Sequence, residues 1–385
     1  MQHIFDTGAV TTPAFVFDQS RLLETGRLLA HLRATSGCKA LYSIKALPLL
    51  PVLELLAPYL DGFSVSSLFE ARLAALTGAT ALHITTPGLR REEIAEVGAL
   101  CDHINFNSLE QFQHLAGLAG PDTALGLRIN PGLSFLDDDR YNPCRSHSRL
   151  GVPMTQFSEA WRQTDIRARL SGLHFHTLFS SASFAPLAAT VEHIGRTLGD
   201  EILASLAWIN LGGGYLFDTV EQMDELGGIV RDIRTRWGLE VFFEPGKAVA
   251  GVAGYWVGSI LDMFVRDGKT VAVLDTTVNH HPEIFEYQKR PEPAWREPDN
   301  GYPVLLTGCS CLAGDIFGEF RFESRPLLGQ RVVFRNAGAY SLIKANRFNG
   351  YNLPSIHLWD GAEDIRQLKS YAWEDYARQW RADPC

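Results

Sequence analysis

The sequence predicts an α/β protein made of a TIM-like (β/α)8 barrel and an antiparallel β-domain. Two observations predict this fold class. Between residues 40 and 245 of the 385-residue chain, eight short β-rich runs alternate with longer amphipathic runs, as in βα units around a parallel sheet. After residue 250, short β-rich runs are separated by turn residues, which is typical of antiparallel strands. We expect a barrel over residues 20–255 and a β-domain from residues 1–19 and 256–385.

Each barrel strand is expected where aliphatic, aromatic and β-branched residues form a short run. The eight expected strands are 40–44, 62–66, 82–86, 103–107, 124–130, 171–176, 207–211 and 239–243. The segments between them have helical spacing, and several begin with Ser or Thr and end on Gly, as helices often do. Examples are 67–78, 108–120 and 219–238. Eight strand and helix pairs are the number that closes a (β/α)8 barrel.

The β-domain is expected to contain strands within 253–265, 269–278, 302–308, 315–322 and 331–340, joined by the opening segment 12–18. Asp18 is a candidate cap for a first helix over 18–36. Near the end of the chain, segment 370–383 places Trp373, Tyr376 and Trp380 at helical spacing. We interpret these aromatic residues as a packing stripe on a C-terminal helix.

The composition is that of an ordinary globular protein and argues against several classes of partner. Lys and Arg number 35 against 44 Asp and Glu, a formal charge of −9. No basic block with interleaved aromatic residues occurs, which argues against nucleic acid. No run reaches the roughly 18 apolar residues of a membrane span, and the first residues lack signal-peptide features. We expect a cytoplasmic protein whose six scattered cysteines are free thiols.

Polar and glycine residues follow four of the expected strands, at the barrel face where catalytic groups gather. These residues are Lys45, His176, Gly212, Gly213, Gly214, Glu244 and Gly246. Any one of them is what a turn requires. A lysine, a histidine, three glycines and a glutamate together fit the needs of turns much less well, and they predict a site.

Lys45 is the centre of the predicted site. A lysine at the end of a buried strand loses several kcal/mol of solvation if it stays charged and unpaired. A desolvated amine has a lowered pKa and is nucleophilic toward an aldehyde, so Lys45 is a candidate for a Schiff base. The aldehyde cofactor that this indicates is pyridoxal 5'-phosphate (PLP). The alternative is a lysine that extends along the barrel rim into solvent.

PLP requires a phosphate cradle, a support for its ring and an acidic partner for its pyridine nitrogen. Gly212–Gly214 can bring backbone N–H groups close to a phosphate. His176 can stack on the ring, and Glu244 can hold the pyridinium proton. The alternatives are turn glycines, a structural histidine and a salt-bridged acid on the barrel rim.

The second domain offers further candidates. GCSCLAGD (308–315) places Cys311 and Asp315 in one loop, NAGAYS (336–341) places Tyr340 after a strand, and Asp275 lies in LDTTVNHHPE. These residues are candidates for a proton donor (Cys311), amine-binding carboxylates (Asp275, Asp315) and a phosphate donor (Tyr340). The alternative for Asp275 is an acid that ends a strand.

The order of YSIKA, HFH, GGG, EPG, GCSCLAGD and GAYS resembles the fold-type III PLP-dependent decarboxylases, the alanine racemase-like barrels that include ornithine and diaminopimelate decarboxylases. The stretches DGFSVSSLFEARLA, LRINPGLSF, YNPCRSHSRLGVP and INLGGGYLF are similar to the carboxynorspermidine (carboxyspermidine) decarboxylases of polyamine synthesis. The resemblance implies a homodimer in which Cys311 and Asp315 enter the partner's active site. It also implies that Asp275 and Asp315 hold distal amines of a cationic substrate.

The resemblance implies PLP-dependent decarboxylation of carboxynorspermidine or carboxyspermidine to norspermidine or spermidine, with protonation by Cys311. The sequence departs from the family at TLFSS (177–181), Lys247 and Leu312. These departures bear on the identity of the substrate and not on that of the cofactor. The alternative is a decarboxylase of the same fold for diaminopimelate, ornithine, lysine or a specialised precursor. Three further alternatives are open. An amino-acid racemase and a PLP-binding regulator are less consistent with the Cys311 loop. A barrel enzyme without PLP is less consistent with Lys45.

Overall fold

The computed structural model describes residue 5 and residues 9–136 and 138–382. It divides into two compact units, Leu23–Val249 and Met1–Leu22 with Ala250–Cys385. Helix α2 (Gln19–Ser36) crosses the boundary between them. The first unit therefore begins and ends a few residues inside the predicted barrel range of 20–255.

The first unit is a closed barrel of parallel strands, as predicted. Within the described residues its eight strands are β2 (Lys39–Ser43), β3 (Gly62–Val65), β4 (Leu82–Thr85), β5 (His103–Phe106), β6 (Ala124–Asn130), β8 (Gly172–His174), β9 (Trp208–Asn210) and β10 (Glu240–Phe243). They pair in this order. The barrel closes where Phe242 and Phe243 of β10 pair with Lys39 and Ala40 of β2. The two-residue strand β7 (Val152–Pro153) pairs beside β6.

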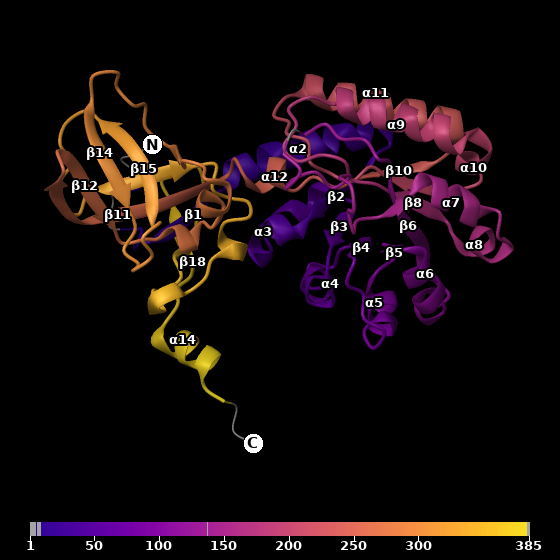
Figure 1. The fold of residues 1–385 in the computed structure, drawn as a ribbon, viewed down its shortest axis with the longest axis horizontal. Coiled ribbons are helices and arrows are strands. Elements are labelled where there is room, and N and C mark those ends of the chain that lie inside the picture. The colour runs from indigo at the N-terminus through magenta and orange to yellow at the C-terminus, as the bar shows by residue number, and fades with distance from the viewer. Residues whose placement is uncertain (1–4, 6–8, 137, 383–385) are drawn as a thin grey trace. The chain divides into compact units, whose positions relative to one another are not determined.

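Helices surround these strands (Figure 1). They include α3 (Leu50–Leu56), α4 (Leu68–Ala75), α5 (Ile94–Leu100), α6 (Leu109–Leu115), α7 (Met154–Trp161), α8 (Thr164–Arg169), α9 (Ala185–Leu198), α10 (Asp200–Ala204) and α11 (Val220–Trp237). The predicted end signals operate: Ser67, Ser108 and Thr219 each accept a hydrogen bond from the third backbone N–H of their helix. Gly238 ends α11 with a φ of 74°, in the left-handed region.

The barrel interior is built around the indole of Trp208. A Cβ at Gly126 would lie 2.3 Å from this ring, and one at Gly172 would lie 2.1 Å from it, so glycine on β6 and β8 makes room for the indole. Beside it, the rings of His83 and His103 stack with centroids 3.8 Å apart. The interior therefore holds polar rings as well as apolar side chains.

The second unit is mostly an antiparallel sheet. Its strands are β1 (Ala14–Asp18), β11 (Gly254–Arg266), β12 (Lys269–Leu274), β13 (Glu292–Pro293), β14 (Tyr302–Thr307), β15 (Ile316–Phe322), β16 (Arg331–Arg335), β17 (Ser355–Trp359) and β18 (Ile365–Lys369). The order is β15-β14-β12-β11-β1-β17-β18, and β16 pairs with β11 and β13. The opening strand joins this sheet, as predicted, and Asp18 accepts hydrogen bonds from the backbone N–H groups of Ser20 and Arg21.

Two pairs in this sheet are parallel, which the pattern of short strands did not indicate. These pairs are β1 with β17 and β12 with β14. Neither pair is joined by a tight turn: the chain between β12 and β14 includes α13 (Glu283–Tyr287) and β13. A long connection lets the second strand return in the same direction as the first.

Trp373 and Trp380 lie on α14 (Trp373–Trp380) and are exposed. The rings of Trp373 and Tyr376 are 5.8 Å apart, and those of Tyr376 and Trp380 are 6.3 Å apart. The rings contact one another, because residues three or four apart are neighbours on a helix, but both tryptophans stay exposed, so the stripe does not form a buried packing face within the described residues.

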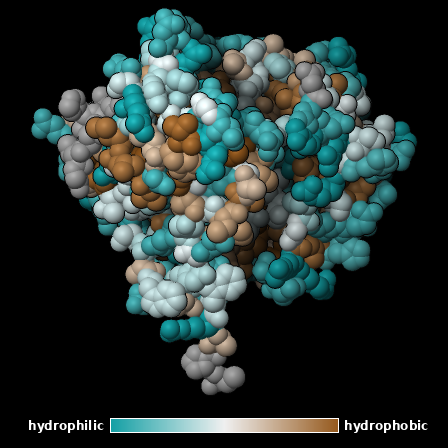
Figure 2. Space-filling view, turned by 60° about the vertical axis from the view of Figure 1, so that its left-hand side comes forward, coloured by the Kyte–Doolittle hydropathy of each residue, from teal (hydrophilic) through white to brown (hydrophobic). Residues whose placement is uncertain are grey.

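On the face displayed in Figure 2, apolar areas are interrupted by hydrophilic side chains. No described helix combines the length and apolar character needed to cross a bilayer. Cys38, Cys101, Cys144, Cys309 and Cys311 are free thiols, as predicted, and Cys385 lies outside the described residues.

Candidate active site

Lys45 lies in a short 3-10 turn, Ile44–Ala46, directly after β2. Its neighbours Ile44 and Ala46 are buried and anchor this turn, while the Lys45 side chain opens on a cavity of about 300 Å³. The residues that line the cavity are Lys45, Arg128, Arg140, Tyr141, Asn142, Pro143, Arg145, Ser148, Arg149, Leu150, His176, Leu178 and Phe179. The cavity therefore brings the end of β2 together with residues on and after β6 and β8.

The Lys45 side chain is exposed to the cavity, yet the protein packed around it lowers the pKa of its amine. Removal from bulk water is the main cause, Glu244 acts in the opposite direction, and Arg128 adds to the lowering. A lower pKa gives a larger fraction of neutral, nucleophilic amine at neutral pH.

Glu244 follows β10 and is buried. Its Oε1 accepts a hydrogen bond of 2.7 Å from Asn210 Nδ2, and its Oε2 lies 3.4 Å from His174 Nε2. Burial raises the pKa of the Glu244 carboxyl, but His174 and Lys45 outweigh burial, and the pKa lies well below its usual range. Burial also lowers the pKa of His174, and Glu244 acts in the opposite direction.

The glycine turn Gly212–Gly214 follows β9 and packs tightly on its surroundings. A Cβ would meet a carbonyl oxygen at each position: Phe175 at 2.4 Å from Gly212, Glu244 at 2.1 Å from Gly213 and Leu178 at 2.3 Å from Gly214. Gly212 and Gly214 also have φ values of +65° and +98°, where glycine is favoured. No other residue type suits this turn without a shift of the backbone.

His176 is held by the same turn. Its Nδ1 accepts a hydrogen bond of 3.1 Å from the N–H of Gly213, which places the ring proton on Nε2. Burial lowers the pKa of His176 well below its ordinary value, and Lys45 lowers it further. His176 therefore presents a neutral ring in a fixed orientation at the cavity.

Gly246 lies against the Lys45 turn. A Cβ there would be 3.3 Å from Ala46 and 3.3 Å from Ser43, and the Ser43 N–H donates to the Pro245 carbonyl at 2.9 Å. The segment that begins with Glu244 thus holds the strand end that carries Lys45.

The candidates in the β-domain lie in the second unit. Cys311 is exposed, and its N–H donates to Asn349 Oδ1 at 2.8 Å. Asp315 is buried: its Oδ1 accepts from the Val278 N–H at 2.8 Å, and its Oδ2 accepts from the N–H and hydroxyl of Ser310 at 3.0 and 2.5 Å. These contacts hold the loop that carries Cys311.

Asp275 and Tyr340 lie at other positions of the same unit. The Asp275 Oδ1 accepts from the Ser259 N–H on β11 at 2.8 Å, and burial raises the pKa of the carboxyl. Tyr340 follows β16 and has a φ of 58°. Substrate binding by Asp275 and Asp315 and phosphate binding by Tyr340 stay predictions.

Five polar residues near Lys45 or Glu244 were not singled out from the sequence: Glu70, His83, Arg128, His174 and Asn210. Arg128, His174 and Asn210 lie on adjacent strands in register with one another, which places them in one layer of the barrel. A charged or amide side chain inside a buried strand is the signal that indicates them, because burial without partners is costly.

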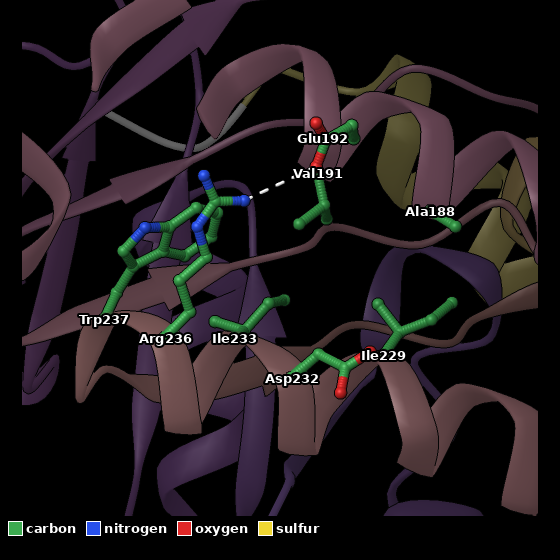
Figure 3. A pocket seen from close by; sticks show the side chains of 8 residues that line it. All are labelled: Ala188, Val191, Glu192, Ile229, Asp232, Ile233, Arg236 and Trp237. Carbon is green, nitrogen blue, oxygen red and sulfur yellow. Dashed lines mark hydrogen bonds and ion pairs between the residues drawn. The ribbon is translucent and has the colours of Figure 1, made fainter. Parts of the chain in front are cut away.

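A second cavity, of about 220 Å³, lies between α9 and α11 in the helical layer. Figure 3 shows Val191 and Glu192 of one helix facing Ile233 and Arg236 of the other, with Arg236 in contact with Glu192 at 3.4 Å. None of the residues lining it is a predicted site residue. The cavity at Lys45 is therefore the candidate active site.

The residues at this cavity and at the strand ends beside it fit PLP. Lys45 supplies an amine with a lowered pKa, and the ionised Glu244 can accept a hydrogen bond from a protonated pyridine nitrogen. In the glycine turn, the N–H groups of Gly212 and Gly213 bond to Asn210 and His176. Of the three glycines, Gly214 is therefore the candidate whose N–H donates a hydrogen bond to the phosphate.

Comparison with known proteins supports this interpretation of the site. Residues 26–251 match the family "Pyridoxal-dependent decarboxylase, pyridoxal binding domain". The carboxynorspermidine/carboxyspermidine decarboxylase of Campylobacter jejuni is 31% identical over 96% of this chain and 98% of its own. The carboxyaminopropylagmatine decarboxylase of Synechocystis is 31% identical over 96% of this chain and 95% of its own.

Solved structures show the same likeness. The crystal structure of Campylobacter jejuni carboxynorspermidine decarboxylase complexed with norspermidine has a TM-score of 0.87 and 28% identity, covering 96% of this chain and 100% of that one. Diaminopimelate decarboxylase of Helicobacter pylori has a TM-score of 0.83 at 18% identity, which shows a shared fold. The predicted fold, family and cofactor are confirmed. The chain belongs to the carboxynorspermidine/carboxyspermidine decarboxylase family of the pyridoxal-dependent decarboxylases.

Proposed function

We propose that this protein decarboxylates a carboxylated polyamine, carboxynorspermidine or carboxyspermidine, to norspermidine or spermidine and CO2. The observation that carries this proposal is Lys45 at the barrel cavity with the buried Glu244 near enough to act on the pKa of its amine, in a chain that resembles such an enzyme over 96% of its length. PLP, when bound, supplies an electron-withdrawing ring that stabilises the electron pair left on the substrate carbon as CO2 departs.

The residues of the barrel position the cofactor. Lys45 would hold the cofactor at its aldehyde carbon, and Glu244 would keep the pyridine nitrogen protonated. His176, fixed by Gly213, supports the ring face, and the turn at Gly214 faces the phosphate, with Tyr340 as a second donor. The lowered pKa values of Lys45 and Glu244 support these roles, because the first favours the neutral, nucleophilic amine and the second favours the ionised carboxylate.

Cys311 is proposed to donate the proton that completes the product. The Cα–carboxylate bond breaks, CO2 leaves, and the thiol proton is transferred to the carbon, after which solvent reprotonates the sulfur. Cys311 is exposed on its loop, and we propose that it acts in the site of a second copy, in a homodimer. Asp275 and Asp315 are proposed to hold distal amines of the substrate in this dimer.

The same chemistry suggests where the protein works. The net charge of −9 disfavours nucleic acid and favours a cationic substrate. The free cysteines among the described residues are those of a reducing compartment. We propose that the protein acts in the cytoplasm.

A second candidate substrate is an amino acid with a distal carboxylate, such as diaminopimelate. Four arginines line the cavity, and its lining residues include no carboxylate. At the cavity wall, the Lys247 ammonium lies 5.2 Å from the ring centroid of Phe179, so two of the sequence departures contact each other. These positively charged side chains attract an anionic group of a substrate more than a protonated amine.

A substrate panel separates the two candidates. The PLP-loaded enzyme would be incubated with carboxynorspermidine, carboxyspermidine, diaminopimelate, ornithine and lysine, and CO2 release measured, with Lys45→Ala as the inactive control. We expect the highest kcat/KM for a carboxylated polyamine. Preference for diaminopimelate would support the second candidate, and no CO2 from any of them would contradict both.

A further inference from the structure

Asn210 ends β9 inside the barrel and is fully buried. It lies between the two parts of the site that are proposed to hold opposite ends of the cofactor. Its Oδ1 accepts a hydrogen bond of 2.9 Å from the N–H of Gly212, the first residue of the glycine turn. Its Nδ2 donates one of 2.7 Å to Glu244 Oε1.

The bond from Gly212 decides which way the Asn210 amide faces. A backbone N–H can only donate, so the side-chain oxygen must point toward Gly212 and the NH2 group toward Glu244. The nitrogen of this NH2 group also lies 3.5 Å from His83 Nδ1. The amide therefore presents a donor, and never an acceptor, to Glu244.

This arrangement bears on the charge of Glu244. The other charged and titratable groups that interact with its carboxyl are His174 of β8, His176 after β8, Lys45 after β2, His83 of β4 and Arg128 of β6. Asn210, on the strand next to β10, makes a shorter contact with Glu244 than His174 does, 2.7 Å against 3.4 Å. Asn210 also carries no charge of its own, so its hydrogen bond to Glu244 does not depend on pH.

We propose, on the basis of the function proposed above, that Asn210 is a positioning residue that holds Glu244 ionised and aimed at the pyridine nitrogen. It acts through Glu244 and does not touch the substrate. The glycine turn gives Asn210 its orientation, so the phosphate end and the ring-nitrogen end of the cofactor site are linked through one side chain.

Asn210→Asp tests this role with little change in shape. The new carboxylate keeps an oxygen for the Gly212 N–H but places a second anion 2.7 Å from Glu244, where two carboxylates compete for one proton. The matched control is Asn105→Asp, because Asn105 is also buried in a barrel strand, β5, but donates to Thr85 Oγ1 at 2.9 Å. The readouts are the PLP dissociation constant of the apo-protein and the pH dependence of the bound cofactor's absorbance.

We expect Asn210→Asp to weaken PLP binding by about tenfold or more and to shift the pH dependence of the absorbance. We expect Asn105→Asp to change PLP binding by less than about threefold. The double variant Asn210→Asp with Glu244→Gln covers the case in which the single variant folds poorly. In the double variant the introduced glutamine amide can donate to the introduced aspartate, which removes the repulsion and restores the melting temperature toward that of Glu244→Gln.

The double-mutant cycle decides the mechanism. If Asn210 acts through Glu244, Asn210→Asp changes PLP affinity by less than about threefold in the Glu244→Gln background. An equal loss of affinity in both backgrounds, or an unchanged affinity and pH profile in Asn210→Asp alone, would overturn the role of Asn210. A wild-type protein that binds no PLP would instead contradict the proposed function, so the two failures are distinguishable.

Discussion

Gly213→Ala is a sharp test of how the glycine turn supports the site. The alanine Cβ would lie 2.1 Å from the Glu244 carbonyl oxygen, whereas ordinary contact begins at 3.4 Å. The backbone of the turn or of Glu244 must therefore move by about 1.3 Å. The φ of Gly213 is not in the left-handed region, so the destabilisation by alanine is a steric effect and not one of backbone conformation.

The magnitude follows from what has to move. Overpacking costs roughly 1–3 kcal/mol, and displacement of Glu244 strains its N–H bond to the Gly212 carbonyl, 2.8 Å long, which is worth about 1 kcal/mol. We expect a loss of about 2–4 kcal/mol in unfolding free energy, or roughly 5–15 °C in melting temperature for a domain of this size. PLP binding should weaken by about tenfold because Glu244 leaves its place.

The measurements are thermal unfolding of the apo-protein and PLP titration followed by absorbance. Gly228→Ala in α11 is the matched control, because the nearest atom to its Cβ is the tip of Arg231 at 4.0 Å. Alanine there should stabilise the helix by roughly 0.5–1 kcal/mol. A Gly213→Ala protein with wild-type melting temperature and PLP affinity would refute the steric reasoning.

Three further predictions follow from the site and its surroundings. Lys45→Ala should purify without the absorbance band of covalently bound PLP; a band retained in this variant would exclude Lys45 as the attachment point. Cys311→Ala should fold and bind PLP but lose much of its decarboxylation or give abnormal products, and unchanged turnover and product would remove Cys311 from the mechanism. Burial lowers the pKa of His280 from 6.5 to about 4, so as pH falls the unfolded chain takes up the proton first and stability is lost between pH 6.5 and 4. At pH 5 this loss is on the order of 2 kcal/mol; denaturant unfolding at pH 7 and 5 should show a smaller loss in His280→Gln, and an equal loss in both proteins would contradict this assignment.

The barrel could be predicted because its signal is local. Each parallel strand reads as a short apolar run, and each helix has its own end signals, such as Ser67 and Gly238. The candidate residues Lys45 and Glu244 could be found for a related reason. The carboxyl ends of parallel strands share one face of a barrel, so position along each strand indicates position in space.

The sheet pairing of the β-domain was harder to predict. Its short strands indicate an antiparallel arrangement, but β1 pairs in parallel with β17, more than 300 residues later. Such a pairing depends on the packing of both strands against the whole sheet and leaves no local pattern in the sequence.

The sequence by itself determined the strand and helix alternation and the residues at the strand ends, including the three glycines at 212–214, whereas the need for glycine there came from the structure. Only the tertiary structure decided which groups contact them. The register of β6, β8 and β9 places Arg128, His174 and Asn210 in one layer, and the last two bond to Glu244. Register is set when the barrel closes, because closure aligns strands far apart in the chain and a shift of one residue would turn each side chain to the opposite face.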